Sequence, residues 1–265
     1  MSETTDRSPP PPVPPAERRA PWVQLRFFTF HPAVFSRMMG DASPDAHAGD
    51  LVSVYDKAGR FCGNGLFNPR AKIPLRVVRH GAEPAGEEYF EDAIRRAIAF
   101  RRETLRLDES TEAYRLINSD GDGLSGLTID RFGPVLAIEA FSLGIVQRLP
   151  GWLPLIHELA GTRHHVLNVE PEIARVERIT PPLLAAIGEG PGGPAPKRIK
   201  IRENNIAFEV DLERGHKTGF FCDQRDNRAR AAQLVAEGAR VLDLCSYSLN
   251  LILSPAHRGS GAAEI

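Results

Sequence analysis

Residues 22–80 alternate short apolar runs with polar turns, a pattern that predicts a series of short strands. The apolar segment 49–56 leads into a tight turn at Gly59, where glycine can take a positive φ. The run 61–67 contains glycines that indicate a bulge or close packing against another backbone. A last apolar run begins near Pro74, and proline suits an edge strand. Several short strands at this spacing predict a small β-barrel.

Residues 87–107 carry the clearest helical pattern in the chain, with one apolar face that repeats at three- and four-residue steps. Acidic residues stand at its start and arginines at its end, which matches the helix dipole. The arginines suit either contact with RNA or an ordinary solvent-exposed helix face. The apolar face consists of Phe90, Ile94, Ala97, Ile98 and Leu105.

Residues 113–141 predict a strand, a glycine-rich turn, a second strand, a turn and a third strand. The turn DGDGLSG (120–126) lacks the Gly-Lys-Ser/Thr ending of a phosphate loop and the glutamate of a calcium loop, so it indicates tight-turn chemistry. A helix is predicted around 149–159 and a strand at 164–170. Together these elements predict an α/β middle domain.

The segment GEGPGGPAP (188–196) predicts a linker. Strands over 199–215, an amphipathic helix over 223–237 and a strand over 240–245 are expected to follow. A compact polar cluster precedes the helix: Lys217, Thr218, Asp223, Gln224, Arg225 and Asn227, set around Gly219, Phe220 and Phe221.

Two interpretations of this polar cluster remain open. Aromatic side chains beside an amide, a guanidinium and a carboxylate can bind a small molecule, and Asp243 stands at a strand end, where open α/β sheets bind ligands. The alternative is a satisfied polar network in which Asp223 caps the following helix.

The composition is that of an ordinary globular protein. The 265 residues are 42% hydrophobic and 25% charged, enough for two small domains and part of a third. A net charge of -1 removes any argument from overall basicity, so nucleic acid would have to bind through local patches. The three cysteines form no Cys-x-x-Cys pair, and His164 and His165 have no spaced partners. We therefore expect buried thiols and surface histidines rather than disulfides or a metal site.

The ends of the chain give no targeting signal. Residues 1–20 are rich in proline and have no apolar core, so they predict a disordered tail and no secretory signal. No run approaches the roughly 20 apolar residues that a membrane span needs. These observations predict a cytoplasmic protein without membrane contact. Whether it forms a homodimer is left open.

Four segments together resemble a known family, the RlmI-type class I ribosomal RNA methyltransferases, which use S-adenosylmethionine to methylate cytosine at C5. The segments are HPAVF (31–35), the stretch 49–78, YRLINSDGDGLSGLTIDRFG (114–133) and FEVDLERGHKTGFFCDQRDNR (208–228), with His216 where glutamine is commoner. The last is similar to the motif that opens the family's methyltransferase domain, and we refer to 208–228 as the opening motif.

The resemblance implies an α/β fold, α+β overall, in several parts. After the tail, residues 21–82 would form a PUA-like RNA-binding barrel, 83–187 an α/β middle domain, and 188–197 a linker. Residues 198–265 would form the start of an incomplete Rossmann-like methyltransferase domain. The implied partner is RNA, most simply ribosomal RNA, and the implied cofactor is S-adenosylmethionine.

The resemblance also implies roles for individual residues. RNA would be contacted by Arg70, Lys72 and Arg76, because cations act on phosphates through charge. The cofactor would be bordered by Phe220, Gln224, Arg225, Asp243 and Tyr247. Cys222 and Cys245 lie outside any nucleophile motif, so no catalytic residue and no metal ligand is assigned.

One departure from the family pattern affects function. Leu249 and Asn250 stand where the family usually has two glycines, and a positive φ there would strain leucine by about 1 kcal/mol or more. The family's next strand, whose acidic end would hold the cofactor ribose, and its later Pro-Cys type motif, which would supply the nucleophile, are missing from this sequence. We therefore expect a truncated, catalytically incomplete form that retains RNA binding. The alternative is a non-catalytic PUA-type RNA-binding or ribosome-assembly protein, which the gene sequence beyond codon 265 would distinguish. An enzyme of other chemistry, such as a nucleotide hydrolase, has no motif in its favour.

Overall fold

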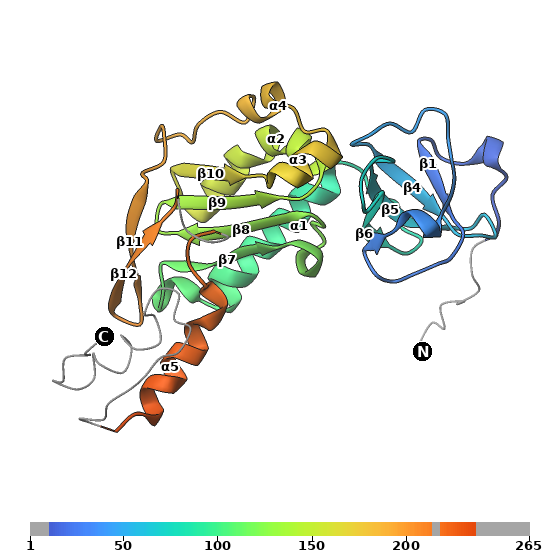
Figure 1. Ribbon diagram of the computed structural model, residues 1–265. Helices are drawn as coiled ribbons and strands as arrows, with labels where there is room; N and C mark the ends of the chain where they lie inside the picture. Colours follow the sequence, from blue (N-terminus) through green and yellow to red (C-terminus); the bar gives the residue numbers. More distant parts are fainter. Residues whose placement is uncertain (1–10, 214–217, 237–265) are drawn as a thin grey trace.

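The computed structural model describes residues 11–213 and 218–236 of the chain. Within them the backbone builds a six-stranded, a four-stranded and a two-stranded sheet, with helices packed mainly on the four-stranded one (Figure 1). This arrangement confirms the expected mixture of α and β structure. No helix among these residues is long and apolar enough to cross a membrane.

The six-stranded sheet curls into the barrel on the right of Figure 1. Its strands are β1 (Trp22–Leu25), β2 (Ala33–Val34), β3 (Met39–Ala42), β4 (Leu51–Tyr55), β5 (Phe61–Phe67) and β6 (Leu75–His80), in the order β2-β6-β5-β4-β1-β3. A Cβ at Gly63 would lie 2.1 Å from the carbonyl oxygen of Arg79, so glycine is required there, as predicted. The prediction that Pro74 marks an edge strand is wrong, because β6 lies between β2 and β5; Pro74 just precedes β6, so its missing N–H breaks no pairing.

Residues 13–18 pack against the barrel, although the sequence predicts a disordered tail through residue 20. The Val13 N–H donates to the carbonyl of Gly59 at 2.8 Å. Arg18 is only 9% exposed, with its guanidinium 4.5 Å from the ring centroid of Trp22 and 4.9 Å from that of Tyr55. Cation–π contacts on two rings hold this segment against the barrel.

The four-stranded sheet has the order β10-β9-β8-β7, from β7 (Ala113–Asn118), β8 (Leu127–Phe132), β9 (Val135–Ala140) and β10 (His164–Asn168). Its helices are α1 (Glu88–Ala99), α2 (Leu143–Ala160), α3 (Pro171–Glu177) and α4 (Pro181–Ala185). Leu116, Ile129 and Ile138 belong to the core that α1 and α2 cover. The helix predicted over 87–107 ends at Ala99 and continues as a π-helical turn, Phe100–Thr104.

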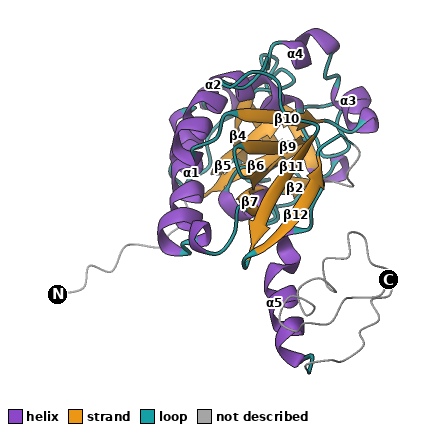
Figure 2. Ribbon diagram, turned by 90° about the vertical axis from the view of Figure 1, so that its left-hand side faces the viewer, coloured by secondary structure: helices purple, strands orange, loops and turns teal. Residues whose placement is uncertain are grey.

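A hairpin packs against the sheet residues Ala113, Phe132 and Ala137, and the helix that follows it projects away from the sheet, on the left of Figure 1. β11 (Arg198–Glu203) pairs antiparallel with β12 (Ile206–Asp211) through a two-residue turn, and α5 (Arg225–Leu234) follows. Both turn residues, Asn204 and Asn205, have positive φ, which asparagine tolerates and a tight hairpin requires. The two views in Figures 1 and 2 place the hairpin beside the sheet and α5 beyond it.

One histidine prediction is wrong. His165 is buried rather than at the surface, and its Nδ1 lies 3.0 Å from Nε2 of buried His157. Sequence spacing could not reveal the pair, because α2 and β10 bring the two rings together. Burial, together with the neighbouring His165, lowers the pKa of His157 to about 4. Both rings are therefore neutral at pH 7, which suits a core position.

The glycine-rich segment after α4 is packed rather than free. The Gly192 N–H donates to the carbonyl of Arg163 at 2.8 Å, and Gly190 bridges to Gly193. A Cβ at Gly190 would lie 2.4 Å from the same Arg163 oxygen. The predicted linker is thus a tight turn against the start of β10, and its glycines allow the close approach.

Candidate functional site

The opening motif is attached to the four-stranded sheet by an aromatic cluster. Phe220 is 4% exposed, and its ring centroid lies 6.4 Å from that of Phe132 in β8 and 5.4 Å from that of Phe208 in β12. The guanidinium of Arg228 lies 4.7 Å from the Phe220 ring centroid. Phe220 therefore joins the sheet, the hairpin and α5.

A buried ion pair fixes α5 to the hairpin. Arg228 and Glu203 have side chains only 1% exposed, and they form two hydrogen bonds, Nε to Oε1 at 2.7 Å and Nη2 to Oε2 at 2.6 Å. Arg228 Nη1 also donates to the carbonyl of Phe221 at 3.1 Å. Removing two charges from water is costly, so this pair depends on having both partners in this bidentate geometry.

A second buried carboxylate lies between the sheet and the opening motif. Asp130 in β8 is 1% exposed and accepts from Arg115 in β7, Nε to Oδ1 at 2.5 Å. Its other oxygen accepts from the hydroxyl of Thr218 at 2.5 Å. Burial alone would lower the pKa of Arg115, but the Asp130 carboxylate outweighs it, so the pKa is raised and the guanidinium stays charged.

Cys222 lies next to this carboxylate but is not prepared for nucleophilic attack. Burial and then the charge of Asp130 raise its pKa well above the usual range. A neutral thiol is a poor nucleophile, which supports leaving Cys222 without a catalytic role. The other candidate thiol, Cys245, lies outside the described residues.

The predicted cofactor residues fall into three groups. Phe220 is buried beneath Arg228, so it can support a cofactor site but not line one. Gln224 and Arg225 are partly exposed at the start of α5 and can reach a ligand. Asp243 and Tyr247 lie outside the described residues. The described residues thus offer two polar side chains for S-adenosylmethionine but no enclosure for it.

The capping alternative for Asp223 is wrong. Gln224 takes the N-cap position of α5, and no side chain caps that end. One Asp223 carboxylate oxygen instead accepts from the Gln224 amide at 3.2 Å. The 3-10 turn Cys222–Gln224, which leads directly into α5, leaves Asp223 exposed before the helix begins.

The three predicted RNA contacts lie in different surroundings. Arg70 and Lys72 are exposed in the loop between β5 and β6, and Lys72 pairs with exposed Glu172 at 3.5 Å. Arg76 is half-buried in β6, and its Nη2 donates to the carbonyl of Phe141 at 3.4 Å. Burial lowers the pKa of Arg76, although Glu177 acts in the other direction. Arg76 therefore points to the contact between barrel and sheet.

That contact is held by residues that the sequence did not single out. The side-chain amide of Asn68 donates to Oε2 of Glu177 at 2.7 Å, and the Leu143 N–H donates to the same oxygen at 3.1 Å. Nearby, Arg148 Nη1 donates to the carbonyl of Gly49 at 2.8 Å while its Nε pairs with Glu87 at 2.8 Å. Asn68 and Glu177 are 109 positions apart, so no local pattern could have linked them.

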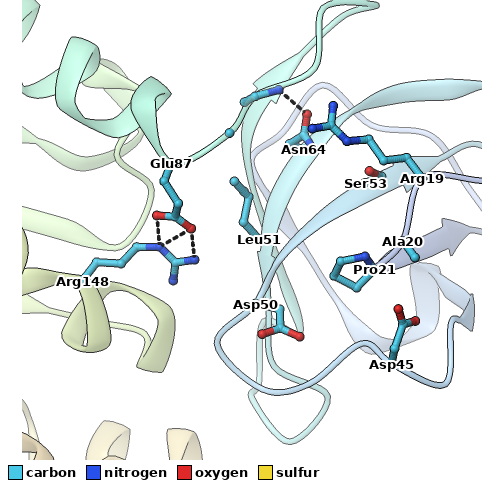
Figure 3. Close-up of a pocket in the computed structure, with 12 residues that line it drawn as sticks. Arg19, Ala20, Pro21, Asp45, Asp50, Leu51, Ser53, Asn64, Glu87 and Arg148 are labelled. Atoms are coloured by element: carbon cyan, nitrogen blue, oxygen red, sulfur yellow. Dashed lines mark hydrogen bonds and ion pairs between the residues drawn. The ribbon is translucent and has the colours of Figure 1, made fainter.

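Beside this contact is a cavity of about 420 Å³, shown in Figure 3. Arg19 and Asp45 line it from the barrel, and Glu87 and Arg148 face each other on its other side. A cavity of about 450 Å³ lies at the start of α1. Neither cavity adjoins Phe220, Gln224 or Arg225. Among the described residues, no group of three or more His, Cys, Asp or Glu side chains could hold a metal ion.

Comparison with known proteins connects these features. Residues 17–80 match a family model described as a PUA-like domain. A ribosomal RNA large subunit methyltransferase I from Shewanella denitrificans is 34% identical over 245 residues, covering 88% of this chain and 58% of the relative. A ribosomal RNA large subunit methyltransferase from Deinococcus radiodurans is 32% identical over 250 residues, covering 92% of this chain and 59% of the relative.

Solved structures share the fold. A methyltransferase crystallised in complex with SAH has a TM-score of 0.66 and 23% identity, over 87% of this chain and 56% of that one. A SAM-dependent methyltransferase from Streptococcus mutans has a TM-score of 0.67 and 22% identity, over 89% and 61% of the two chains.

The fold and these matches define a class of protein, a PUA-like barrel joined to a chain similar to ribosomal RNA methyltransferases. Within that class, the chain belongs to the RlmI-like family of ribosomal RNA large subunit methyltransferases. It spans a little under three fifths of the length of the relatives compared, at 58% and 59%.

Proposed function

We propose that this chain serves the methylation of large-subunit ribosomal RNA at cytosine C5 with S-adenosylmethionine, and that its described part supplies RNA binding. One observation carries the proposal. A PUA-like barrel and the opening motif are attached to the same four-stranded sheet, in a chain that matches named ribosomal RNA methyltransferases over most of its own length. The sheet would hold bound RNA in a fixed position relative to the opening motif.

In this proposal Arg70 and Lys72 contact phosphates. Both are exposed, and the single ion pair of Lys72 is a surface pair, which costs little to exchange for a phosphate. Such contacts set affinity rather than sequence choice. Arg76 has a different part, because its guanidinium is directed at the carbonyl of Phe141. It would align the barrel with the sheet and affect RNA only indirectly.

Gln224 and Arg225 would border the cofactor, together with Asp243 and Tyr247, whose roles rest on the resemblance of the opening motif and the following strand. S-adenosylmethionine supplies the methyl group when it is bound. Leu249 and Asn250, in place of two glycines, are proposed to weaken its binding. With ribosomal RNA as the substrate, the protein would act in the cytoplasm. The proposal does not require a homodimer.

RNA binding is tested with fragments of large-subunit ribosomal RNA and the full chain, by filter binding over a range of NaCl concentrations. We expect affinity to fall steeply with salt, because each phosphate contact releases a counterion. Absence of binding, or binding insensitive to salt, would overturn the RNA part of the proposal.

The cofactor part is tested separately by calorimetry with S-adenosylmethionine. We expect the variant Leu249→Gly/Asn250→Gly to bind more tightly than the wild-type chain, by about tenfold if roughly 1.4 kcal/mol of strain and crowding is relieved. Micromolar affinity in the wild type with no gain in the variant would overturn the argument from these two side chains.

A further inference from the structure

The chain from the end of β1 to just past β2 exposes an unusual number of aromatic side chains. In the described part of the chain, seven large apolar residues are exposed, and four of them lie within nine positions. They are Phe27, Phe28, Phe30 and Phe35, with exposed fractions of 63%, 44%, 79% and 46%. Single exposed apolar residues are normal, but a group of aromatic rings, three of them in the loop between β1 and β2, marks a binding surface.

Two of these rings are held in place. The ring centroids of Phe28 and Phe30 lie 4.8 Å apart at 87°, and both contact His80 at the end of β6, at 6.2 and 5.8 Å. Burial lowers the pKa of His80, so its ring is neutral at pH 7 and packs as an aromatic. The rings therefore present a formed edge-to-face group rather than loose side chains.

The backbone of the same loop is fixed by hydrogen bonds. The His31 N–H donates to the hydroxyl of Thr29 at 2.9 Å, and the Ala33 N–H donates to Nδ1 of His31 at 3.0 Å. The Val77 N–H in β6 donates to the carbonyl of Pro32 at 2.8 Å. A loop held in this way loses little freedom when a ligand binds, which favours affinity.

Unpaired positive charge lies beside the rings. Arg26 directly precedes Phe27, and its N–H donates to the carbonyl of Met38 at 2.8 Å, which brings Arg26 next to the segment that carries Arg37. Both arginines are exposed, and neither has a carboxylate partner among the described residues. Asp41 is the sole acidic residue in the stretch 22–43. The surface thus combines aromatic rings with free guanidinium groups.

We propose that Phe27, Phe28 and Phe30, with Arg26 and Arg37, form a site on which unpaired bases of single-stranded RNA stack while the arginines meet its phosphates. The inference rests on the proposed RNA function and adds a subsite that recognises unpaired rather than helical RNA. Every nucleotide offers a ring face and a phosphate, which matches this surface. A symmetric contact with a second copy of the chain would instead set this arginine-bearing surface against itself and bring like charges together.

The test uses the full chain and a fluorescein-labelled RNA of about 12 nucleotides, as a single strand and as a duplex of the same sequence. Fluorescence anisotropy between about 50 and 200 mM NaCl gives affinity and its salt dependence. We expect Phe28→Ala/Phe30→Ala to weaken single-strand binding by roughly 5- to 150-fold, the range for one lost stacking contact, and duplex binding by less than about twofold. The slope of log K against log salt for this variant should equal that of the wild type.

A second variant separates charge from stacking. Arg26→Gln/Arg37→Gln should lower the slope of log K against log salt by about 1.4 for the single strand, two contacts at about 0.7 each. Phe100→Ala is the matched control, since Phe100 is 47% exposed but lies after α1 on the other part of the molecule, and its affinity should equal that of the wild type.

Three results would overturn the inference. In the first, the phenylalanine variant, folded by circular dichroism, binds the single strand as well as the wild type does. In the second, it loses single-strand and duplex binding equally. In the third, the wild type is a dimer by light scattering and the variant a monomer, so that a second copy occupies the rings. If the wild type binds neither the single strand nor the duplex, the proposed RNA function fails together with the stacking site. If the wild type binds RNA but the variants behave as in the results above, only the stacking site fails.

Discussion

Within residues 11–213 and 218–236, two sets of polar contacts join the four-stranded sheet to its neighbours, one to the barrel and one to the opening motif, and they use different chemistry. The barrel joint consists of Asn68, Glu177, Arg148 and Glu87, and it contains one buried carboxylate, reached by uncharged donors. Its ion pair is open to water at one end, since the Glu87 side chain is 61% exposed. Exposed pairs of this kind contribute little to stability.

The motif joint consists of Asp130, Arg115, Thr218, Glu203 and Arg228. It holds two carboxylates and one guanidinium at about 1% exposure, each met by charged or hydroxyl partners. A buried ion pair tolerates little separation, because each partner alone would be a charge without water. The difference indicates that the buried charges of the motif joint tolerate less separation than the polar contacts of the barrel joint, although the barrel also contributes Leu66 and Val78 to the apolar core under α1 and α2.

The largest expected effect comes from breaking the motif joint with Glu203→Gln. Arg228 would keep its charge in a site that is 1% exposed, so the free energy of unfolding should fall by about 3–5 kcal/mol. Urea unfolding followed by circular dichroism measures this. The matched control is Glu209→Gln in the same hairpin, whose pair with Arg198 is exposed and should contribute less than about 1 kcal/mol. Equal losses in the two variants would contradict the account.

Acid should weaken the sheet that carries both joints. The folded-state pKa of His157, about 4, lies below the usual 6.5, so the unfolded chain binds more protons between these values. The contribution of neutral His157 to the free energy of unfolding is therefore fully present above pH 6.5. It falls as the pH drops toward 4, by at most about 3 kcal/mol at about 1.4 kcal/mol per pKa unit. Thermal midpoints at several pH values measure the loss. His157→Leu should be less stable at neutral pH but should lose much less on acidification; an unchanged acid response would rule out His157 as the cause.

The barrel joint should give a smaller effect. Asn68→Ala removes the amide that reaches the Glu177 carboxylate and leaves only the Leu143 N–H, so we expect a loss of about 1–3 kcal/mol. Urea unfolding can be compared with Asn168→Ala, an exposed asparagine at the end of β10, which should change stability by less than about 0.5 kcal/mol. A loss as large as that of Glu203→Gln would remove the distinction between the joints.

The smallest effect separates two of the predicted RNA contacts. Arg70→Gln should lower the salt slope of rRNA binding by about 0.7–0.9 and leave stability unchanged, because Arg70 is exposed. Arg76→Gln should leave the slope unchanged and lower the thermal midpoint, because Arg76 is directed at Phe141. If Arg76→Gln instead lowers the salt slope and leaves the thermal midpoint unchanged, Arg76 contacts RNA directly.

Local patterns were enough to predict much of the fold. The glycine bulge in β5, the helix α1 and the short strands of the barrel all follow from residues near one another in the sequence. The start of α2 was missed, because Pro150 and Pro154 interrupt its apolar pattern, although both prolines are exposed inside the helix. Surface prolines in a buried helix cannot be told from helix-ending ones by pattern alone.

The joints could not be predicted, for a different reason. Thr218 and Asp130 are 88 positions apart, and Arg228 and Glu203 are 25 apart, so their pairing depends on how the sheet and hairpin meet. An isolated glutamate or arginine in a strand or helix is usually an exposed residue. The aromatic residues of the opening motif were recognised, but Phe220 proved to be buried rather than exposed to a ligand.

Amide hydrogen exchange on Glu203→Gln and Asn68→Ala tests the account most directly, because it reads the two joints separately in the full chain. We predict that Glu203→Gln loses protection in β11, β12 and α5 while β4 and β5 of the barrel keep theirs, and that Asn68→Ala loses it around Leu143 and Glu177 while α5 is unchanged. Loss of protection across the whole chain in both variants, or an unchanged α5 in Glu203→Gln, would contradict the claim that the sheet carries the barrel and the opening motif through two independent joints.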